Sequence, residues 1–254
     1  AQWQSNVVAL EGGVARLAGR TDVRLGASGG LAGGTDTTCL RLGCRVLVDA
    51  GTGLAALDSH TMADIDHVLL THSHLDHILS VGLLADSVCA RRTHPVVVHA
   101  LPATLKGLKD HIFNDMIWPD FTRLPTPQSP VLVLRPIQVG QRLELAGLQI
   151  DVLPAEHTVP ACGFAVQGQE GWWIFTGDTG PNPQLWPLLS QRRIKMLVIE
   201  TAFSDQEIEL ARLSKHMAPS LLQEELAHIP AKDPVVLQVV REDRTFYVSL
   251  TRDS

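Results

Sequence analysis

The segment His72-Ser73-His74-Leu75-Asp76-His77 places four potential metal ligands within six residues. It directly follows residues 67–71, an apolar run that predicts a short buried strand. Side chains repeat every 3.6 residues in a helix and every 2 in a strand, so neither period puts all four ligands on one face. Loops at strand ends can aim side chains at a common point. The segment therefore predicts a site for zinc, manganese or iron rather than a chance group of polar surface residues.

Three further candidate ligands lie downstream, at predicted ends of strands or starts of helices. His157 follows the predicted strand 149–154, Asp178 follows the predicted strand 172–176, and His216 precedes the predicted helix 219–228. Each alone is weak evidence, but three with the same kind of placement support one common site. Asp49 ends another predicted strand, and there the competing interpretation is a simple turn-initiating aspartate.

The length and composition favour a single domain. The chain has 254 residues, of which 45% are hydrophobic and 19% charged, enough for one large core spanning residues 1–254. The predicted helices are residues 78–85, 102–112 and 219–228, and residues 118–130 read as a loop. The predicted strands are residues 37–42, 45–49, 67–71, 96–99, 131–139, 142–145, 149–154, 163–167, 172–176, 196–200 and 235–240. Two strand-rich halves, each covered by helices, predict an α+β fold of the four-layer αββα sandwich type.

The charge pattern narrows the class of partner. The formal net charge is −6 and no block of Lys and Arg occurs, so we expect no nucleic acid as partner. A small anionic substrate is compatible with this charge, because bound metal ions would supply positive charge locally. No run of 18 apolar residues occurs, so no membrane span is predicted. We expect a cytoplasmic protein, because no signal peptide is present in the sequence. A periplasmic location is the alternative, because the sequence begins at Ala1 rather than Met and a signal peptide could have been removed.

The cysteines suggest ordinary usage. The chain contains Cys39, Cys44, Cys89 and Cys162, with no CxxC pair. We expect them to be small buried residues, and a disulfide between Cys39 and Cys44 is the alternative in an oxidising compartment.

Residues 71–77 (THSHLDH) resemble the HxHxDH signature of the metallo-β-lactamase superfamily. Within it, several segments are similar to class II cyclic-nucleotide phosphodiesterases, and the likeness covers most of residues 23–228. These segments are LGASGG at 25–30, DAGT at 49–52, HIFNDMIWPDF at 111–121, IETAF at 199–203 and HMAPSLLQEEL at 216–226. The sequence departs from that pattern at Ile78-Leu79-Ser80, Ala202 and Met217, which leaves the substrate more in doubt than the metal site.

The resemblance implies a site for two divalent metal ions, most simply zinc, with manganese or iron as alternatives. Asp49 would support the site through hydrogen bonds rather than by ligation. Asp76, Asp178 and His216 would take part in catalysis, and Asp178 would bridge the two ions. One ion would be held by His72, His74 and His157, and the other by Asp76, His77 and His216.

The implied reaction is hydrolysis of a 3′,5′-cyclic nucleotide, cyclic AMP or cyclic GMP, to the 5′-nucleotide by a water that the two ions activate. His216 or a bound water would protonate the leaving 3′ oxygen. Phe113 or Trp118 would stack on the base and Asn114 would hydrogen-bond to it, although plain core packing is an equally simple explanation of these aromatic residues. A homodimer stays open.

Three other functions remain in view. A transfer-RNA 3′-processing phosphodiesterase shares the ligand set, but it should carry a basic arm for RNA, which this sequence lacks. The second is a sulfatase or lactonase on the same scaffold, which the ligands do not exclude. A non-catalytic binding module is the third, and the intact set of seven ligands argues against it.

Overall fold

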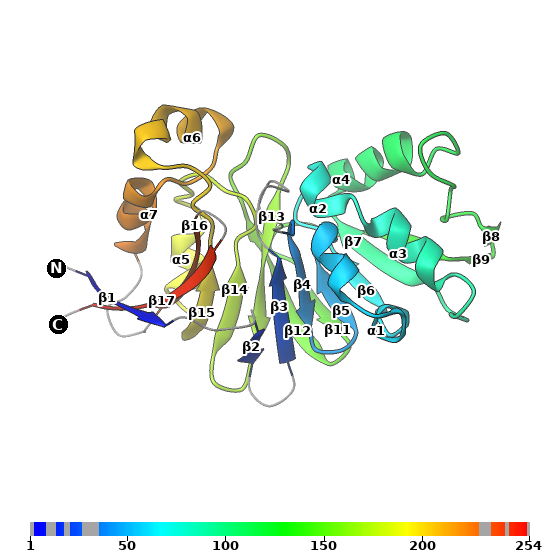
Figure 1. The fold of residues 1–254 in the computed structure, drawn as a ribbon, viewed down its shortest axis with the longest axis horizontal. Helices are drawn as coiled ribbons and strands as arrows, with labels where there is room; N and C mark the ends of the chain where they lie inside the picture. Colours follow the sequence, from blue (N-terminus) through cyan, green and yellow to red (C-terminus); the bar gives the residue numbers. More distant parts are fainter. Residues whose placement is uncertain are drawn as a thin grey trace. The chain divides into compact units, whose positions relative to one another are not determined.

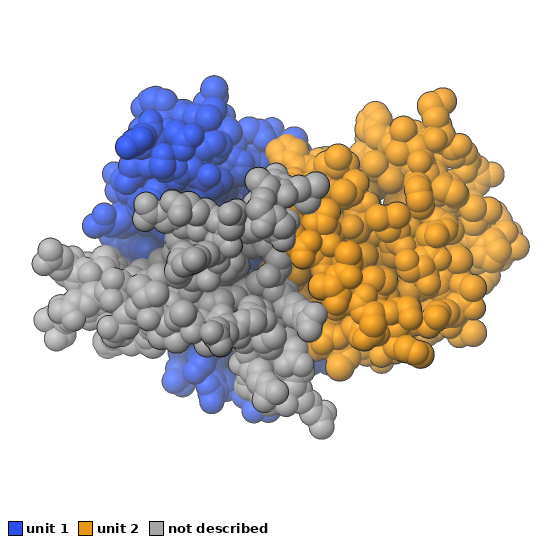
Figure 2. Space-filling view, in the orientation of Figure 1, with its two compact units in different colours: residues 1–18, 139–254 blue, residues 19–138 orange. Residues whose placement is uncertain are grey.

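The strands of the chain gather into separate sheets, with helices between them in the sequence (Figure 1). The computed structural model describes residues 3–8, 14–17, 21–26, 36–228, 235–241 and 244–252, and it describes side chains within 36–228. The chain divides into unit 1, residues 1–18 and 139–254, and unit 2, residues 19–138 (Figure 2). Both units mix helices and sheets, so the predicted α+β class is confirmed. That residues 1–254 form one domain stays a prediction.

The sheet of unit 2 is built on parallel strands. Its order is β10-β7-β6-β5-β4-β3, in which β5, β6, β7 and β10 run parallel and β4 runs antiparallel to both of its neighbours. The strands are β3 (Thr21–Gly26), β4 (Cys39–Leu42), β5 (Val46–Val48), β6 (His67–Leu69), β7 (Val96–Ala100) and β10 (Leu132–Pro136). Because β5 and β6 are parallel neighbours, their carboxyl ends lie at one edge of the sheet. That edge brings the segment after β5 close to the segment after β6.

Helices follow the parallel strands of unit 2, as crossover connections require. They are the 3₁₀ turn η2 (Thr52–Ala56), α1 (Ser59–Ala63), α2 (Leu75–Ile78), α3 (Val81–Val88), α4 (Pro102–Gly107) and the π-helical turn η3 (Leu108–Ile112). A two-stranded ribbon, β8 (Pro125–Thr126) and β9 (Ser129–Pro130), lies within the predicted loop. Buried apolar residues of α3, among them Leu84 and Val88, form one core with Val68 of β6 and Val98 of β7.

The main sheet of unit 1 is a meander with one added parallel strand. Its order is β11-β12-β13-β14-β15, antiparallel up to β14, with β15 parallel to β14. The strands are β11 (Arg142–Leu145), β12 (Leu148–Pro154), β13 (Cys162–Gln167), β14 (Trp172–Phe175) and β15 (Ile194–Val198). Since β12 and β14 are both antiparallel to β13, the strands β12, β14 and β15 all end at the same edge. The segments that follow them therefore begin close together.

Unit 1 also contains helices and a second sheet. The helices are α5 (Trp186–Leu189), the 3₁₀ turn η4 (Asp205–Glu207), α6 (Ile208–Ser214) and α7 (Pro219–Leu226). Leu221 and Leu222 of α7 pack with Leu189 of α5 and Ile174 of β14 in one buried cluster. The second sheet has the order β1 (Trp3–Val8), β17 (Arg244–Arg252), β16 (Val235–Arg241), and a short strand β2 covers Val14–Leu17.

The predicted helix at 78–85 is wrong at its start. The chain becomes helical at Leu75, inside the ligand segment, and breaks at Leu79 and Ser80 before α3 begins. The break has a tertiary cause, because the Ser80 amide donates to the carbonyl of Ala50 (2.8 Å) instead of to the preceding turn. The predicted helix 102–112 changes register in a similar way: the Phe113 amide donates five residues back, to Leu108 (2.8 Å), which makes the π-helical turn.

None of the four cysteines, all of which lie within residues 36–228, forms a disulfide. Cys39 and Cys162 are buried, as expected of small apolar residues, whereas Cys44 and Cys89 are exposed, so that expectation is wrong for these two. No helix in the part of the chain that the structure describes has the length and apolarity needed to cross a bilayer.

Unit 2 contains a pair of neighbouring histidines outside the ligand segment, one buried and one partly exposed. His99 of β7 is 1% exposed, and its Nε2 lies 3.2 Å from Nδ1 of His67 on the adjacent strand β6. Burial, together with the charges of the neighbouring His67 and Arg135, lowers the pKa of His99 to about 4. The unfolded chain takes up this proton near pH 6.5, but the folded chain does so only near pH 4. Stability linked to His99 is therefore complete above pH 6.5 and is lost as the pH falls towards 4.

Replacing His99 with leucine should reduce the acid sensitivity of unfolding. The linkage amounts to up to about 3 kcal/mol between pH 7 and pH 4, and the variant should lose this part of the pH dependence. Urea unfolding across that pH range measures it. His60→Leu, which removes an exposed imidazole on α1, is the control. Equal pH slopes for His99→Leu and the parent chain would contradict the assignment.

Candidate metal centre

The ligand segment of unit 2 starts at the end of β6 and runs into the first turn of α2. Its side chains, together with Asp49 and Thr71, are called the unit 2 cluster. His72 and His77 are buried, at 0% and 1% exposure. The ring centroid of His72 lies 4.7 Å from that of His74 and 4.2 Å from that of His77. Strand end and helix start thus gather three imidazoles within one short segment.

Asp49 forms the base of the unit 2 cluster. It follows β5, adopts a left-handed backbone conformation (φ +57°) and is completely buried. Its carboxylate accepts hydrogen bonds from the Thr71 amide (2.8 Å), the Thr71 hydroxyl (2.9 Å) and Nδ1 of His77 (2.7 Å). Burial raises the pKa of Asp49, and the bonds from His77 and Thr71 oppose that rise. The hydrogen bonds expected of Asp49 are present, and its role in supporting a metal site stays a prediction.

The Thr71 hydroxyl determines which nitrogen of the His72 ring carries the hydrogen. This hydroxyl donates to Asp49 and lies 3.0 Å from Nδ1 of His72. An oxygen that has given its proton to a carboxylate can only accept from the ring, so Nδ1 of His72 carries the hydrogen. In both His72 and His77, Nε2 is then the nitrogen with the lone pair.

Asp76 and His77 present two electron-pair donors to each other. Nε2 of His77 lies 3.3 Å from Oδ2 of Asp76, while the other ring nitrogen serves Asp49. A neutral ring and an ionised carboxylate in this arrangement repel unless a positive charge lies with them. A proton shared by the two groups, or a metal ion bound to both, would remove this repulsion. An imidazole nitrogen and a carboxylate oxygen are suitable ligands for zinc or another divalent ion.

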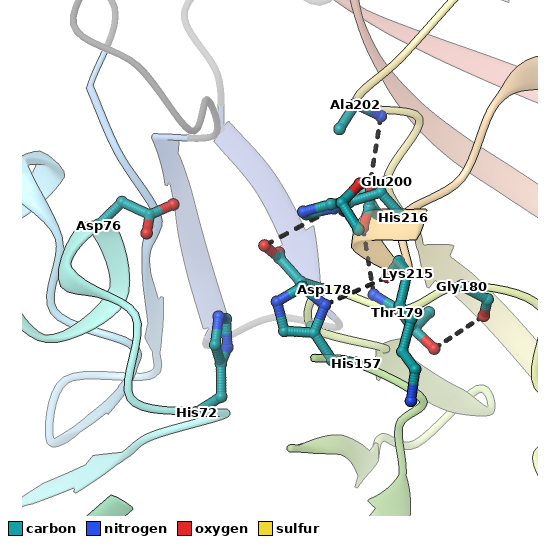
Figure 3. Close-up of polar contacts among 12 residues, drawn as sticks. His72, Asp76, His157, Asp178, Thr179, Gly180, Glu200, Ala202, Lys215 and His216 are labelled. Atoms are coloured by element: carbon teal, nitrogen blue, oxygen red, sulfur yellow. Dashed lines mark hydrogen bonds and ion pairs between the residues drawn. The ribbon is translucent and has the colours of Figure 1, made fainter. Parts of the chain in front are cut away.

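Unit 1 carries a second group of candidate ligands, called the unit 1 cluster: His157 after β12, Asp178 after β14 and His216 before α7. One potential ligand atom from each lies within 4.8 Å of those of the other two. Figure 3 shows these side chains converging, with Glu200 behind His216. His157 is 6% exposed, and the side chains of Asp178 and His216 are about one-fifth exposed. The three sequence-predicted residues of this unit are therefore brought together.

Each histidine of the unit 1 cluster is held through Nδ1. His157 donates to the carbonyl of Lys215 (3.1 Å), and His216 donates to Oε1 of Glu200 (2.5 Å) (Figure 3). A carbonyl oxygen and a carboxylate only accept, so the hydrogen must be on Nδ1 in each ring. Nε2 again remains as the ligand atom. This is the tautomer that metal-binding histidines adopt when a second group fixes the ring.

Glu200 is a residue of the site that the sequence analysis did not assign. It follows β15 and also accepts from the amides of Thr179 (3.1 Å) and Ala202 (3.0 Å). Burial raises the pKa of Glu200, the charge of Asp178 raises it further, and the bond to His216 opposes the rise. Its position directly after a buried strand is the signal that marked the other site residues, and that signal could have identified it.

A family model described as the beta-lactamase superfamily domain matches residues 44–237. The chain belongs to the β-lactamase superfamily. The predicted superfamily is confirmed. The match covers every candidate ligand in both clusters.

Two superfamily relatives differ in their named activity. The chain is 28% identical over 183 residues to a probable 3′,5′-cyclic-nucleotide phosphodiesterase of Yersinia pestis, covering 64% of this chain and 50% of the relative. It is 32% identical over 119 residues to a ribonuclease Z of Bradyrhizobium sp. (strain ORS 278), covering 45% of this chain and 37% of the relative. The chain thus spans half or less of the length of these proteins.

Solved structures of the superfamily share the fold. Unliganded yeast PDE1 matches with a TM-score of 0.67 and 19% identity, over 80% of each chain. The metallo-β-lactamase fold protein YhfI of Bacillus subtilis matches with a TM-score of 0.62 and 20% identity, over 81% of this chain and 80% of that one. These similarities confirm the metallo-β-lactamase fold.

The structure gives local roles to the residues predicted to bind a base. Phe113 is 1% exposed and belongs to the core of unit 2, which favours the core-packing explanation. Asn114 accepts from the amides of Met116 and Ile117 and donates to the carbonyl of Asp110. The Trp118 indole donates to the carbonyl of Gly82 (3.2 Å). Their part in substrate binding stays a prediction, and residues 27–30 of the LGASGG segment lie outside the described residues.

Gly51 allows the turn after β5 to approach the ligand segment closely. A Cβ atom there would lie 2.2 Å from the Asp76 carbonyl oxygen and 2.2 Å from Oγ1 of Thr37. Gly51→Ala should therefore lower the free energy of unfolding by at least about 1–3 kcal/mol through overpacking. Chemical denaturation measures this loss. Gly107→Ala in α4, where the nearest atom is 3.8 Å away, is the control, and equal stabilities of the two variants would refute the explanation.

Proposed function

We propose that this chain is a binuclear metal-dependent phosphodiesterase that hydrolyses 3′,5′-cyclic nucleotides. The observation that carries the proposal is the unit 1 cluster, in which the potential ligand atoms of His157, Asp178 and His216 lie within 4.8 Å of one another. In both of its imidazole rings Nδ1 is hydrogen-bonded within the protein, which leaves Nε2 as the potential ligand atom. A group of this composition suits a divalent ion.

The ligand assignment in the proposal is the one that the resemblance implies. His72, His74 and His157 would hold one ion, Asp76, His77 and His216 would hold the second, and Asp178 would be a ligand common to both. When bound, two such ions supply Lewis-acid chemistry, which lowers the pKa of a water and stabilises negative charge on the phosphate oxygens. Zinc is the ion we expect, and manganese or iron would suit the same ligands.

Other groups of the chain keep the hydrogen of each imidazole on Nδ1. Asp49 holds the hydrogen of His77 at Nδ1, the Lys215 carbonyl holds that of His157, and Glu200 holds that of His216. Each ring is thereby oriented before substrate arrives, which reduces the reorganisation that catalysis requires.

The cyclic-nucleotide substrate is supported by the similarity to the Yersinia pestis relative. RNA is the second candidate substrate, because a segment of 119 residues is 32% identical to a ribonuclease Z. Both are phosphodiesters, so the same cluster would serve either one. A small substrate fits a chain without a basic block better than a long polyanion does. Cytoplasmic location and a homodimer remain predictions.

A substrate panel with Asp178→Ala tests the proposal. The metal-loaded chain should hydrolyse cyclic AMP or cyclic GMP, and Asp178→Ala should reduce turnover about a thousandfold, the scale of losing one charge-stabilising group. Asp86→Ala, at an exposed position of α3, is the control. The panel also contains a generic phosphodiester, an aryl sulfate and a precursor transfer RNA. Cleavage of the RNA alone would replace the substrate assignment, and normal turnover by Asp178→Ala would remove the bridging role.

Loss of the Glu200 carboxylate should weaken metal binding. In Glu200→Ala, His216 loses the acceptor that fixes its tautomer, and removing such a partner typically reduces metal affinity 10–100-fold. Competition with a chromogenic zinc chelator gives the affinity. Glu209→Ala on α6, which removes an exposed carboxylate, should bind zinc like the parent chain. An unchanged affinity in Glu200→Ala would show that His216 needs no such support.

A further inference from the structure

A buried carboxylate of unit 1 has no part in the chemistry proposed above. Glu225 of α7 is 8% exposed. Its Oε2 accepts hydrogen bonds from the Asn182 amide (2.8 Å) and from the indole N–H of Trp186. Among the residues that the structure describes, no lysine, arginine or histidine nitrogen lies within ion-pair distance of this carboxylate. Glu225 is therefore held by hydrogen bonds to neutral groups.

Asn182 extends this contact to another part of the sheet. It is 4% exposed, and its side-chain amide donates to the carbonyl of Pro154 (3.0 Å) at the end of β12. Its side-chain oxygen accepts from the Gln184 amide (3.2 Å). The residues Glu225, Asn182 and Pro154 thus form one hydrogen-bonded brace from α7, through the segment after β14, to the end of β12.

Each end of the brace lies close in sequence to one ligand of the unit 1 cluster. His157 is three residues after Pro154, and Asp178 is four residues before Asn182. His216 lies three residues before α7 begins at Pro219. One carboxylate therefore connects the three segments that carry the three candidate ligands.

Other contacts, closer to the ligands in sequence, also join these three segments. The Gly180 amide donates to the Glu156 carbonyl (2.8 Å), and the Glu156 amide donates to the Thr179 hydroxyl (2.9 Å). A Cβ at Gly180 would lie 3.2 Å from Cα of Lys215, the residue whose carbonyl holds His157. A shift of any one segment would alter the distances between the ligand atoms.

We propose that Glu225 is a positioning residue for the unit 1 cluster, and that through Asn182 it keeps His157, Asp178 and His216 at the separation that a metal ion requires. The proposal rests on the proposed metal-dependent function. Loss of the carboxylate leaves two buried donors without their acceptor, and they regain partners only if the segments move. An amide oxygen can still accept both bonds, so glutamine should preserve the brace and alanine should not.

The test compares four variants of the full chain in zinc affinity and thermal stability. Glu225→Ala should bind zinc about tenfold more weakly, at the lower end of the effect of removing a supporting group. Glu225→Gln should restore most of the affinity. Glu224→Ala removes the exposed neighbour on the same helix, and Leu222→Ala destabilises the same helix without touching the brace. A chelator competition at a temperature where all variants are folded gives the affinities.

A cobalt-substituted sample adds a readout independent of catalysis. The visible absorption of bound Co²⁺ depends on ligand geometry, so it should change in Glu225→Ala and remain unchanged in Leu222→Ala. Equal zinc affinities and spectra for Glu225→Ala and the parent chain would overturn the positioning role. So would an equal loss in Leu222→Ala, which would mean that helix stability alone is responsible. A parent chain that binds no zinc would instead refute the proposed function.

Discussion

The fixed position of the hydrogen on each imidazole is the constraint on which the rest of the site depends. A neutral imidazole has one nitrogen that donates and one that accepts, so a ring that binds a metal through Nε2 must keep its hydrogen on Nδ1. His77 and His216 each donate to a carboxylate, and His157 donates to a backbone carbonyl. His72 donates to a hydroxyl whose own hydrogen goes to Asp49. Within each unit, the acceptors prepare the rings before any ligand arrives.

Those acceptors are available only because of where the strands end. In unit 2 the parallel pairing of β5 and β6 places Asp49 beside Thr71 and His77. In unit 1 the strands β14 and β15 run parallel, so Glu200 reaches both Thr179 and His216. The fold thus determines the site through strand direction, since the segments that follow parallel strands meet at one edge.

The sequence predicts the parts of this arrangement that are local. The strand-then-ligand pattern identified His72 to His77, and it placed His157 and Asp178 after strands that the structure contains. It did not predict the break at Ser80, because the carbonyl that captures this amide belongs to Ala50, thirty residues earlier. Glu200 follows a strand, as the other site residues do, but its partners Thr179 and His216 lie on separate segments, so its role as their acceptor could not be predicted. Contacts between distant segments leave no periodic trace in the sequence.

Electrostatics explains why the unit 1 cluster is suited to binding a cation. Asp178 and Glu200 lie close enough for the charge of Asp178 to raise the pKa of Glu200, and burial raises it as well. Two carboxylates beside neutral imidazoles repel each other unless a proton or a metal ion compensates them. A bound divalent ion would remove this repulsion with both acids ionised, whereas a proton on Glu200 would remove its negative charge and so weaken the hydrogen bond that orients His216. The two acids that repel each other are therefore the groups that make cation binding favourable.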